Sequence, residues 1–149
     1  IGEACHFIDL MIYLTGALVT EVHMSSLGVH YEDNTDNAII TLKFSNGSQG
    51  VINYFSNGSK AYAKERIEIY QDNRTLLIDN FKSLIGFGFK GFSRLRTGLD
   101  KGHAYQFKQL IETIKNGTGP LIPITELENV SNASFAAIES LQTKSRVFI

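Results

Sequence analysis

The sequence predicts an α+β fold in which helices pack on one face of an open, mainly antiparallel β-sheet. Three observations predict this class: a helical pattern opens the chain, strand patterns joined by short turns fill its middle, and helical patterns return from His103 onward. Strands joined by short turns pair antiparallel, and helices that lie outside the strand block cover a face of the sheet. We expect all 149 residues to form one domain.

The first helix is predicted over residues 3–14, where apolar side chains recur at helical spacing until Gly16 ends the pattern. Because apolar residues cover nearly the whole circumference, we expect this helix to be buried. The apolar residues of the predicted helix are Cys5, Phe7, Ile8, Leu10, Met11, Ile12 and Leu14.

Strand patterns follow. The first strand is predicted over residues 18–29, and we interpret His23 and His30 as ordinary strand residues. In the next strand Ala38, Ile40, Leu42 and Phe44 alternate with polar residues, which is typical of a strand with one buried face.

Two hairpins are expected from turn chemistry. Asn46-Gly47 tolerates the positive φ angles of a tight turn and leads into a strand over residues 49–55. Residues 66–70 and 75–78 form the second hairpin across a polar turn.

Two helices complete the fold. One starts at His103 and is stopped by Asn116-Gly117. The last runs from Thr125 towards Lys144, and Thr125 with Glu128 has the spacing of a capping box.

Composition excludes several classes of function. With 43% hydrophobic residues, this length buries enough surface to fold without disulfides or a structural metal. Balanced charges, 14 Lys+Arg against 15 Asp+Glu, argue against nucleic-acid binding, and no apolar run reaches membrane-spanning length. We expect no nucleic-acid or membrane partner. The single cysteine and the lack of a signal-peptide pattern fit a cytoplasmic protein.

The string Gly86-Phe87-Gly88-Phe89-Lys90-Gly91 matches the G-x-G-x-x-G pattern of dinucleotide sites. That pattern has meaning only between a strand and a helix, and here a strand or loop follows. We interpret the string as a flexible or bulged sheet segment, and a nucleotide site is the less favoured alternative.

A basic segment spans residues 82–101, with five basic residues against Asp100 alone. Its cations, Arg94 and Arg96 among them, would hold a phosphorylated or nucleotide-linked substrate. Alternatively, they mark an edge strand whose charges discourage aggregation, which is the favoured interpretation.

The most informative cluster is His6 and Asp9, which lie three positions apart on one side of the first helix, with Tyr13 one turn further on. A histidine next to a carboxylate is suited to general-base chemistry near neutral pH. For an arbitrary His-x-x-Asp, a buried structural histidine is the more common explanation. No second pair of His or Cys residues with ligand spacing accompanies His6, so the sequence predicts no metal site. Cys5 is interpreted as an inert buried thiol.

Three segments of the chain form recognisable motifs. The first is Ile1-Gly2-Glu3-Ala4-Cys5-His6-Phe7-Ile8-Asp9-Leu10 with Tyr13-Leu14-Thr15-Gly16, and the second is Asp100-Lys101-Gly102-His103 leading into Phe107. The third is Pro120-Leu121-Ile122-Pro123 with Glu126 and the stretch Phe135-Ala136-Ala137-Ile138-Glu139-Ser140-Leu141. Together they resemble the Gfo/Idh/MocA superfamily of oxidoreductases, in particular its C-terminal substrate-binding and oligomerisation domain. The resemblance spans essentially the whole chain. Its nearest form is the fusion to a zinc-alcohol-dehydrogenase-like half, often linked to polysaccharide assembly.

The resemblance implies an NAD- or NADP-dependent oxidoreductase acting on a sugar, nucleotide sugar or cyclic polyol. His6 occupies the catalytic histidine position, Asp9 would orient it, and Lys101 with His103 would line the substrate side. Tyr13, Arg94 and Arg96 are further candidates for substrate binding. The family often has Asp four residues before the histidine; here that residue is Gly2, so Glu3 is the candidate replacement.

The chain opens at Ile1 without an initiator Met. In the family, the glycine-rich NAD loop and a catalytic lysine belong to an N-terminal Rossmann domain, which we expect to be missing from this chain. We therefore expect this chain alone to be inactive and to bind no cofactor tightly. The alternative function is a non-catalytic sheet domain for self-association or ligand binding. In both cases we expect a homo-oligomer through the open sheet face.

Overall fold

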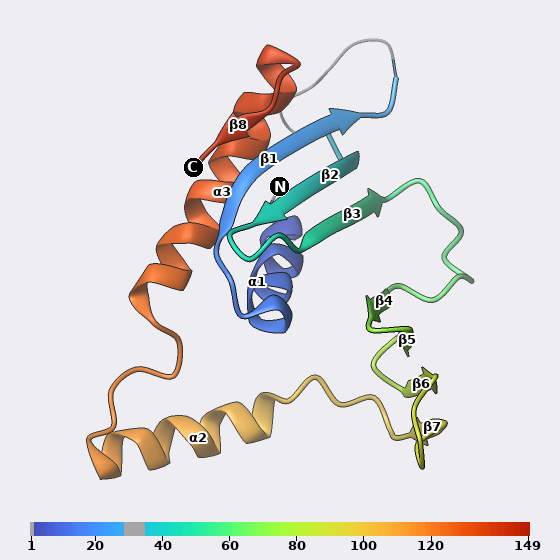
Figure 1. Ribbon diagram of the computed structural model, residues 1–149, viewed down its shortest axis with the longest axis vertical. Coiled ribbons are helices and arrows are strands. Elements are labelled where there is room, and N and C mark those ends of the chain that lie inside the picture. Colours follow the sequence, from blue (N-terminus) through green and yellow to red (C-terminus); the bar gives the residue numbers. More distant parts are fainter. Residues whose placement is uncertain (1, 29–34) are drawn as a thin grey trace. The chain divides into compact units, whose positions relative to one another are not determined.

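The computed structural model describes residues 2–28 and 35–149 (Figure 1). The elements in chain order are α1 (Ala4–Thr15), β1 (Val19–Ser26), β2 (Asn37–Phe44), β3 (Gln49–Phe55), β4 (Arg66–Gln71), β5 (Arg74–Asp79), β6 (Ser83–Phe87), β7 (Arg94–Arg96), α2 (His103–Asn116), α3 (Ile124–Thr143) and β8 (Val147–Phe148). Contacts divide them into two compact units, Ile1–Asn57 with Ile122–Ile149, and Gly58–Leu121.

The first unit is an antiparallel sheet with strand order β3-β2-β1-β8, and α1 and α3 lie on one face of it (Figure 1). Strand β2 is buried at every second residue, because Ala38, Ile40, Leu42 and Phe44 face the helices. This alternation confirms the predicted strand. The turn through Asn46-Gly47 joins β2 to β3 as predicted, with Gly47 at φ +86°.

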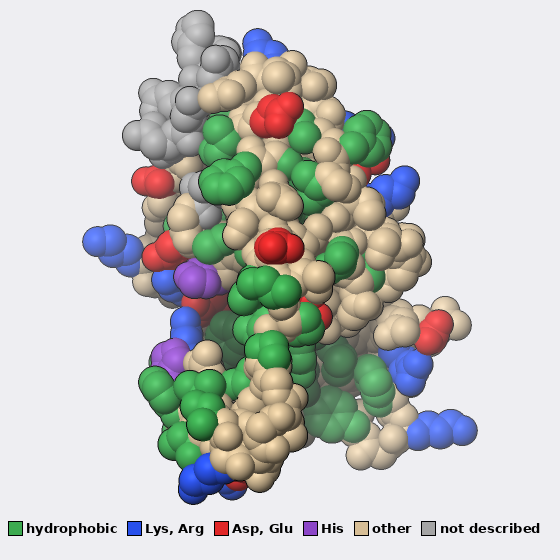
Figure 2. All heavy atoms as spheres, turned by 90° about the vertical axis from the view of Figure 1, so that its left-hand side faces the viewer, with side chains coloured by type: hydrophobic (Ala, Val, Ile, Leu, Met, Phe, Trp, Pro, Cys, Tyr) green, Lys and Arg blue, Asp and Glu red, His purple; other side chains and the backbone are tan. Residues whose placement is uncertain are grey.

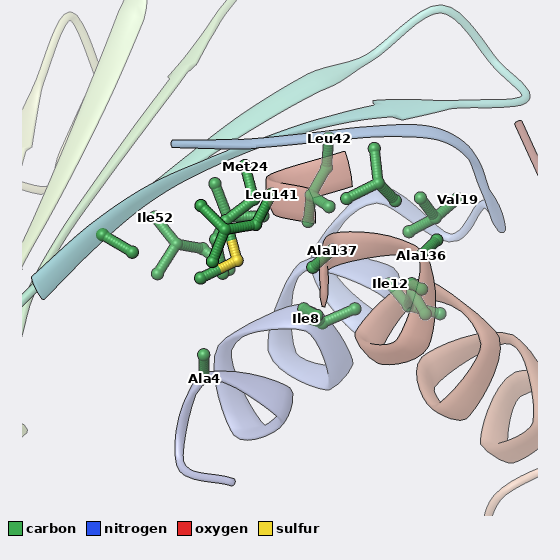
Figure 3. Packing of buried hydrophobic residues seen from close by; sticks show 14 of the residues in the cluster. Ala4, Ile8, Ile12, Val19, Met24, Leu42, Ile52, Ala136, Ala137 and Leu141 are labelled. Atoms are coloured by element: carbon green, nitrogen blue, oxygen red, sulfur yellow. The ribbon is translucent and has the colours of Figure 1, made fainter. Parts of the chain in front are cut away.

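The hydrophobic core lies between this sheet and the two helices (Figure 3). Helix α3 brings Ala133, Ala136 and Ala137 into it, and such small side chains let the helix approach α1 and β1 closely. Full burial of an Ile side chain contributes about 1.5–3 kcal/mol. The buried apolar residues are Ala4, Ile8, Ile12, Val19, Val22, Met24, Ala38, Ile40, Leu42, Phe44, Ile52, Ala133, Ala136, Ala137 and Leu141.

Two polar side chains of α3 bind the backbone of β1. Asn129 pairs with both backbone groups of Val19, and the hydroxyl of Ser140 accepts a hydrogen bond from the Met24 N–H at 3.0 Å. Strand β8 pairs only with Glu21 and Val22 of β1. The two side chains therefore provide hydrogen-bond partners for backbone groups of β1 on either side of its short pairing with β8.

Helix α1 is buried on one side only, whereas the sequence predicted a helix buried on all sides. Its buried residues are Ala4, Ile8 and Ile12, whereas Tyr13 is 79% exposed and Leu14 41% exposed. The prediction of burial on all sides is wrong, because the core contacts one side of the helix only. Gly16 ends the helix in the left-handed conformation, with φ +62°, as predicted.

The second unit contains a separate antiparallel sheet with strand order β4-β5-β6-β7. The predicted hairpin of β4 and β5 is confirmed, with a turn at Asp72 and Asn73, both at positive φ. On one face of this sheet the strands carry mainly apolar side chains, most of them half-buried. These are Ile67, Ile69, Leu76, Ile78, Leu84 and Leu95.

Helix α2 has the predicted start at His103 and the predicted stop, with Gly117 in the left-handed conformation. None of its residues is buried, and its apolar stripe is exposed. The stripe consists of Phe107, Leu110, Ile111 and Ile114. Hydrophobic side chains at the surface are also visible in the face that Figure 2 presents.

The open antiparallel sheets with their helices confirm the predicted fold class. The division of the strands between two sheets is not specified by turn signals, which fix pairing within a hairpin only. The predicted capping box is wrong: α3 starts at Ile124 after Pro123, without a side-chain cap hydrogen bond. Predictions for Val29 and His30 lie outside the described residues.

Candidate active site

Helix α1 carries the predicted catalytic group. Burial of Ile8 and Ile12 fixes the rotation of the helix, so that His6 is exposed to solvent and Asp9 half-buried. Tyr13 follows one turn after Asp9 and is open to solvent. An exposed imidazole in this position is accessible to a substrate hydroxyl, which a buried structural histidine is not.

Asp9 lies near His6 in sequence, but within the described residues no hydrogen bond or ion pair joins the two side chains. The backbone N–H of His6 donates to the Glu3 carbonyl at 3.2 Å, which starts the helix. The orienting role of Asp9 therefore stays a prediction.

Glu3 contacts a residue that the sequence motifs do not indicate. The phenol of Tyr54, on β3, donates a hydrogen bond to Glu3 Oε2 at 3.5 Å. Burial first, and then the carboxylates of Glu3 and Asp36, raise the pKa of the Tyr54 phenol above its ordinary value of 10.0. The alternation of β3 places Tyr54 on the same face as Ile52, but nothing local in the sequence signals contact with a residue 51 positions away.

These residues line a cavity of about 280 Å³ in the first unit. Its lining combines carboxylates, a phenol and a hydroxyl with apolar side chains of the core. The lining residues are Gly2, Glu3, Ala4, Met24, Thr35, Asp36, Ala38, Ile40 and Tyr54. The cavity lies at the N-terminal end of α1, one helical turn before His6.

Cys5 is half-buried, and its thiol donates to the Gly2 carbonyl at 3.0 Å. The expected full burial of this thiol is therefore wrong, and its inertness stays a prediction. Within residues 2–28 and 35–149, no group of three or more His, Cys, Asp or Glu side chains is arranged to hold a metal ion.

The second unit carries the other predicted residues. Arg94 and Arg96 lie on the edge strand β7, both exposed and on the same face, which fits the edge-strand interpretation of the basic segment. His103 is exposed at the first position of α2, after Gly102 in the left-handed conformation. The N–H of Gly102 donates to Asp100 Oδ1 at 2.8 Å, which fixes the turn before the helix.

Lys101 has a specific partner. Its ammonium lies 2.7 Å from Glu65 Oε1 and 5.6 Å from the centroid of the Phe81 ring. Glu65 is only 8% exposed and is one of three buried polar or charged residues among those described. The pair fixes the segment before α2 to the start of β4, a contact that the sequence did not indicate.

The glycine string has a packing explanation. A Cβ at Gly86 would lie 2.6 Å from the Phe92 ring, and one at Gly88 would lie 2.6 Å from the backbone oxygen of Asn73. Phe89 packs edge-on against Phe92 and lies under the Arg74 guanidinium. The string runs from β6 through a turn to β7 and no helix follows it, which supports the interpretation as a sheet segment.

An exposed network on β4 is the other electrostatic feature of this unit. Tyr70 donates a short hydrogen bond to Glu68, and Arg66 pairs with the same carboxylate at 2.8 Å. The hydrogen bonds from Tyr70 and Arg66 lower the pKa of Glu68, and the hydrogen bond to the Glu68 carboxylate raises the pKa of Tyr70. All three side chains are at the surface and line no cavity described here.

Solved structures of several dehydrogenases and oxidoreductases share the fold of this chain. An oxidoreductase domain protein from Kribbella flavida matches with TM-score 0.76 and 20% identity, over 98% of this chain and 50% of that one. Levoglucosan dehydrogenase in complex with NADH and levoglucosan matches with TM-score 0.77 and 18% identity, over 98% and 48%. UDP-N-acetylglucosamine 3-dehydrogenase from Acidithiobacillus ferrooxidans matches with TM-score 0.73 and 16% identity, over 93% and 45%.

The sequence model of the GFO/IDH/MocA C-terminal domain matches residues 3–77, about half of the chain. The chain therefore belongs to this family, as its motifs had indicated. It spans half or less of the length of the solved structures named above. No curated protein matches it. In the part of the chain that the structure describes, every helix is too short or too polar to cross a membrane.

Proposed function

We propose that this chain is the C-terminal part of an NAD- or NADP-dependent dehydrogenase that oxidises a hydroxyl group of a sugar, nucleotide sugar or polyol. The observation that carries the proposal is His6, exposed on α1 one turn after Glu3, inside the segment that matches the family. A solvent-accessible imidazole is suited to remove a hydroxyl proton near neutral pH.

In this proposal His6 takes the proton of the reacting hydroxyl, while Asp9 and Glu3 set the charge around it. Lys101, His103, Tyr13, Arg94 and Arg96 are proposed to line the substrate side. The nicotinamide supplies the hydride acceptor when it is bound. The described residues do not fit a dinucleotide, because the glycine string leads into β7 rather than a helix. We propose that a Rossmann domain elsewhere in the parent protein holds the cofactor.

Two of the similar structures support a sugar or nucleotide sugar as the substrate, because they are a levoglucosan dehydrogenase and a UDP-N-acetylglucosamine 3-dehydrogenase. If the substrate is a nucleotide sugar, Arg94 and Arg96 are positioned two residues apart on one face to contact its phosphates. A fusion to a zinc-alcohol-dehydrogenase-like half and a role in polysaccharide assembly are further proposals that rest on the sequence resemblance.

The test uses the full-length parent protein with a panel of sugars, polyols and nucleotide sugars and both cofactors. His6→Ala should lower kcat by a factor of about 10² or more, the range of a general base. His23→Gln is the matched control, because His23 lies on β1 and is half-buried beside Ser140. Wild-type activity of the His6→Ala protein would overturn the role of His6.

A second candidate, a non-catalytic domain for self-association or ligand binding, is favoured by one observation. The face of the first sheet opposite the helices exposes Ile39, Val51 and Phe55 at 39%, 53% and 44%. Exposed apolar patches are typical of association sites. We propose a homo-oligomer through this face in either case, and light scattering that finds a stable monomer at high concentration would contradict it.

A further inference from the structure

We propose that Asn57 is a site of spontaneous chemical modification, at which the side-chain amide is lost through a cyclic imide formed with the backbone nitrogen of Gly58. The inference does not depend on the proposed function, because the chain reacts only with itself and with water. It rests on a comparison of two identical stretches of sequence that the fold places in different surroundings.

The sequence Phe-Ser-Asn-Gly-Ser occurs twice in the chain, at residues 44–48 and at residues 55–59. In both copies the phenylalanine is the last residue of a strand, Phe44 of β2 and Phe55 of β3. Because glycine has no side chain, the backbone nitrogen that follows each asparagine can approach the amide closely. Since the residues around the two asparagines are the same, a difference in their reactivity has to come from the structure.

In the first copy, hydrogen bonds hold the groups that would react. The Asn46 side-chain amide donates to the Thr15 carbonyl at 3.0 Å, and its oxygen accepts from the Ser48 N–H at 3.0 Å. The Gly47 N–H, whose nitrogen would have to attack, donates to the Phe44 carbonyl at 2.9 Å. Cyclisation at Asn46 therefore requires the turn between β2 and β3 to open first (Figure 1).

In the second copy, the hydrogen bonds lie before the reacting groups. The Ser56 N–H donates to the Asp36 carbonyl at 3.1 Å, and the backbone N–H of Asn57 donates to Asn37 Oδ1 at 3.2 Å. Among the described residues, no hydrogen bond involves the Asn57 side chain or the Gly58 N–H, and both residues are exposed. The amide and the attacking nitrogen are therefore both open to solvent.

The third Asn-Gly pair of the sequence, Asn116-Gly117, lies at the end of α2. There the Gly117 N–H donates to the Thr113 carbonyl as part of the helix cap. The attacking nitrogen of this pair is engaged, as it is at Gly47. In the described part of the chain, Asn57-Gly58 is thus the one Asn-Gly pair whose attacking nitrogen has no hydrogen bond.

The reaction needs no catalyst and no cofactor. The Gly58 nitrogen bonds to the side-chain carbonyl carbon of Asn57 while the bond from that carbon to the amide nitrogen breaks, and the amide leaves as ammonia with the proton that Gly58 lost. Water then opens the imide at one of its two carbonyls, which gives aspartate or isoaspartate. Isoaspartate adds one methylene to the backbone between β3 and β4, and both products add a negative charge.

The hydrogen bonds predict the difference in rate. Each typical hydrogen bond that has to open before cyclisation slows the reaction about fivefold. Asn46 and the nitrogen that follows it have three such bonds. We therefore expect Asn57 to react at least about tenfold faster than Asn46 in the folded protein.

The experiment incubates the full-length parent protein at mildly alkaline pH and follows the peptides of both copies in one sample, by digestion and mass spectrometry. The Asn57 peptide should gain the mass of an amide converted to a carboxyl group, and chromatography should resolve isoaspartyl and aspartyl forms. In urea the two rates should become similar, because the two copies have the same sequence and neither is folded.

Two substitutions test the route. Asn57→Gln moves the amide one carbon further from the nitrogen, and Gly58→Ala puts a Cβ next to the attacking nitrogen, so each should remove most of the modification while the far-UV circular dichroism stays unchanged. Asn132→Gln, an exposed asparagine on α3 that precedes an alanine, is the matched control and should leave the rate at Asn57 as in the wild type.

Four outcomes overturn the proposal. Equal rates at Asn46 and Asn57 in the folded protein would show that the hydrogen bonds do not control the reaction. A rate difference that persists in urea would assign it to more distant sequence. An unchanged rate at Asn57 in Gly58→Ala would exclude attack by the Gly58 nitrogen. Aspartate as the only product would show direct hydrolysis of the amide, which forms no isoaspartate.

Discussion

Asn129 on α3 makes two hydrogen bonds with the backbone of Val19 on β1. Its side-chain oxygen accepts from the Val19 N–H at 2.8 Å, and its side-chain amide donates to the Val19 carbonyl at 3.0 Å. The amide thus takes the place that a neighbouring strand would have at this point of β1, since β8 pairs only with Glu21 and Val22.

We predict that Asn129→Ala lowers the free energy of unfolding by about 2 kcal/mol, because two hydrogen bonds of about 1 kcal/mol each are lost. Urea unfolding followed by far-UV circular dichroism measures the change. Asn132→Ala, an exposed position on the same helix, is the control and should stay within about 0.5 kcal/mol. Equal effects of the two substitutions would contradict the role of Asn129.

Ser140→Ala should be destabilising for a related reason. Ser140 is fully buried, and its hydroxyl accepts from the Met24 N–H and donates to the Ser145 carbonyl. Removing the hydroxyl leaves a buried backbone donor without its partner, which costs about 1–3 kcal/mol. Ser131→Ala removes an exposed hydroxyl of the same helix and serves as the comparison. If both variants unfold at the same urea concentration, Ser140 is not part of the attachment of α3.

The secondary structure could largely be predicted because its determinants are local. The alternation in β2, the Asn46-Gly47 turn and the glycines that end α1 and α2 act within a few residues, and the structure has each of them in place. The rotation of α1 could not be predicted, because Ile8 and Leu14 are equally apolar and only the position of the core distinguishes them.

The candidate site could be predicted only in part. The helix that carries His6 and Asp9 is in place, because it depends on local spacing. The contacts of Glu3 with Tyr54 and of Glu65 with Lys101 join residues 51 and 36 positions apart. Neither contact has a periodic or motif signal, since each is produced by the pairing of strands and the packing of helices on them.

Gly88→Ala should destabilise the second unit. Gly88 has φ +78°, and an added Cβ would lie 2.6 Å from the backbone oxygen of Asn73, which cannot move without distorting the turn between β4 and β5. We expect a loss of about 2 kcal/mol from the left-handed backbone and the contact together. Gly98→Ala, where the Cβ would meet nothing within 4 Å, is the matched control. A Gly88→Ala protein with the urea midpoint of the control would disprove the packing explanation of the glycine string.

The Tyr54 phenol should titrate above pH 10.0, the ordinary value, because burial and two carboxylates oppose its ionisation. The folded state then holds the phenolic proton more tightly than the unfolded state. The resulting stability is complete below pH 10.0 and is lost as the pH rises through the folded-state pKa. NMR titration of ring-labelled tyrosine measures the pKa, and Glu3→Gln should lower it part of the way, since burial is the larger cause. An unchanged pKa in Glu3→Gln would show that the carboxylate does not act on the phenol.

Lys101 should contribute to stability through Glu65 whether or not it also contacts a substrate. Lys101→Met leaves the buried Glu65 carboxylate without its cation, and we expect a loss of about 1–3 kcal/mol. Glu65→Gln in the same chain removes the unpaired charge, so the double variant should recover part of that loss. The coupling energy from the four unfolding measurements isolates the pair. Lys82→Met, an exposed lysine in the turn between β5 and β6, controls for the loss of a positive charge alone. If the double variant is as unstable as the sum of the two single ones, Lys101 does not stabilise the fold through Glu65, and its role reduces to the one proposed at the substrate.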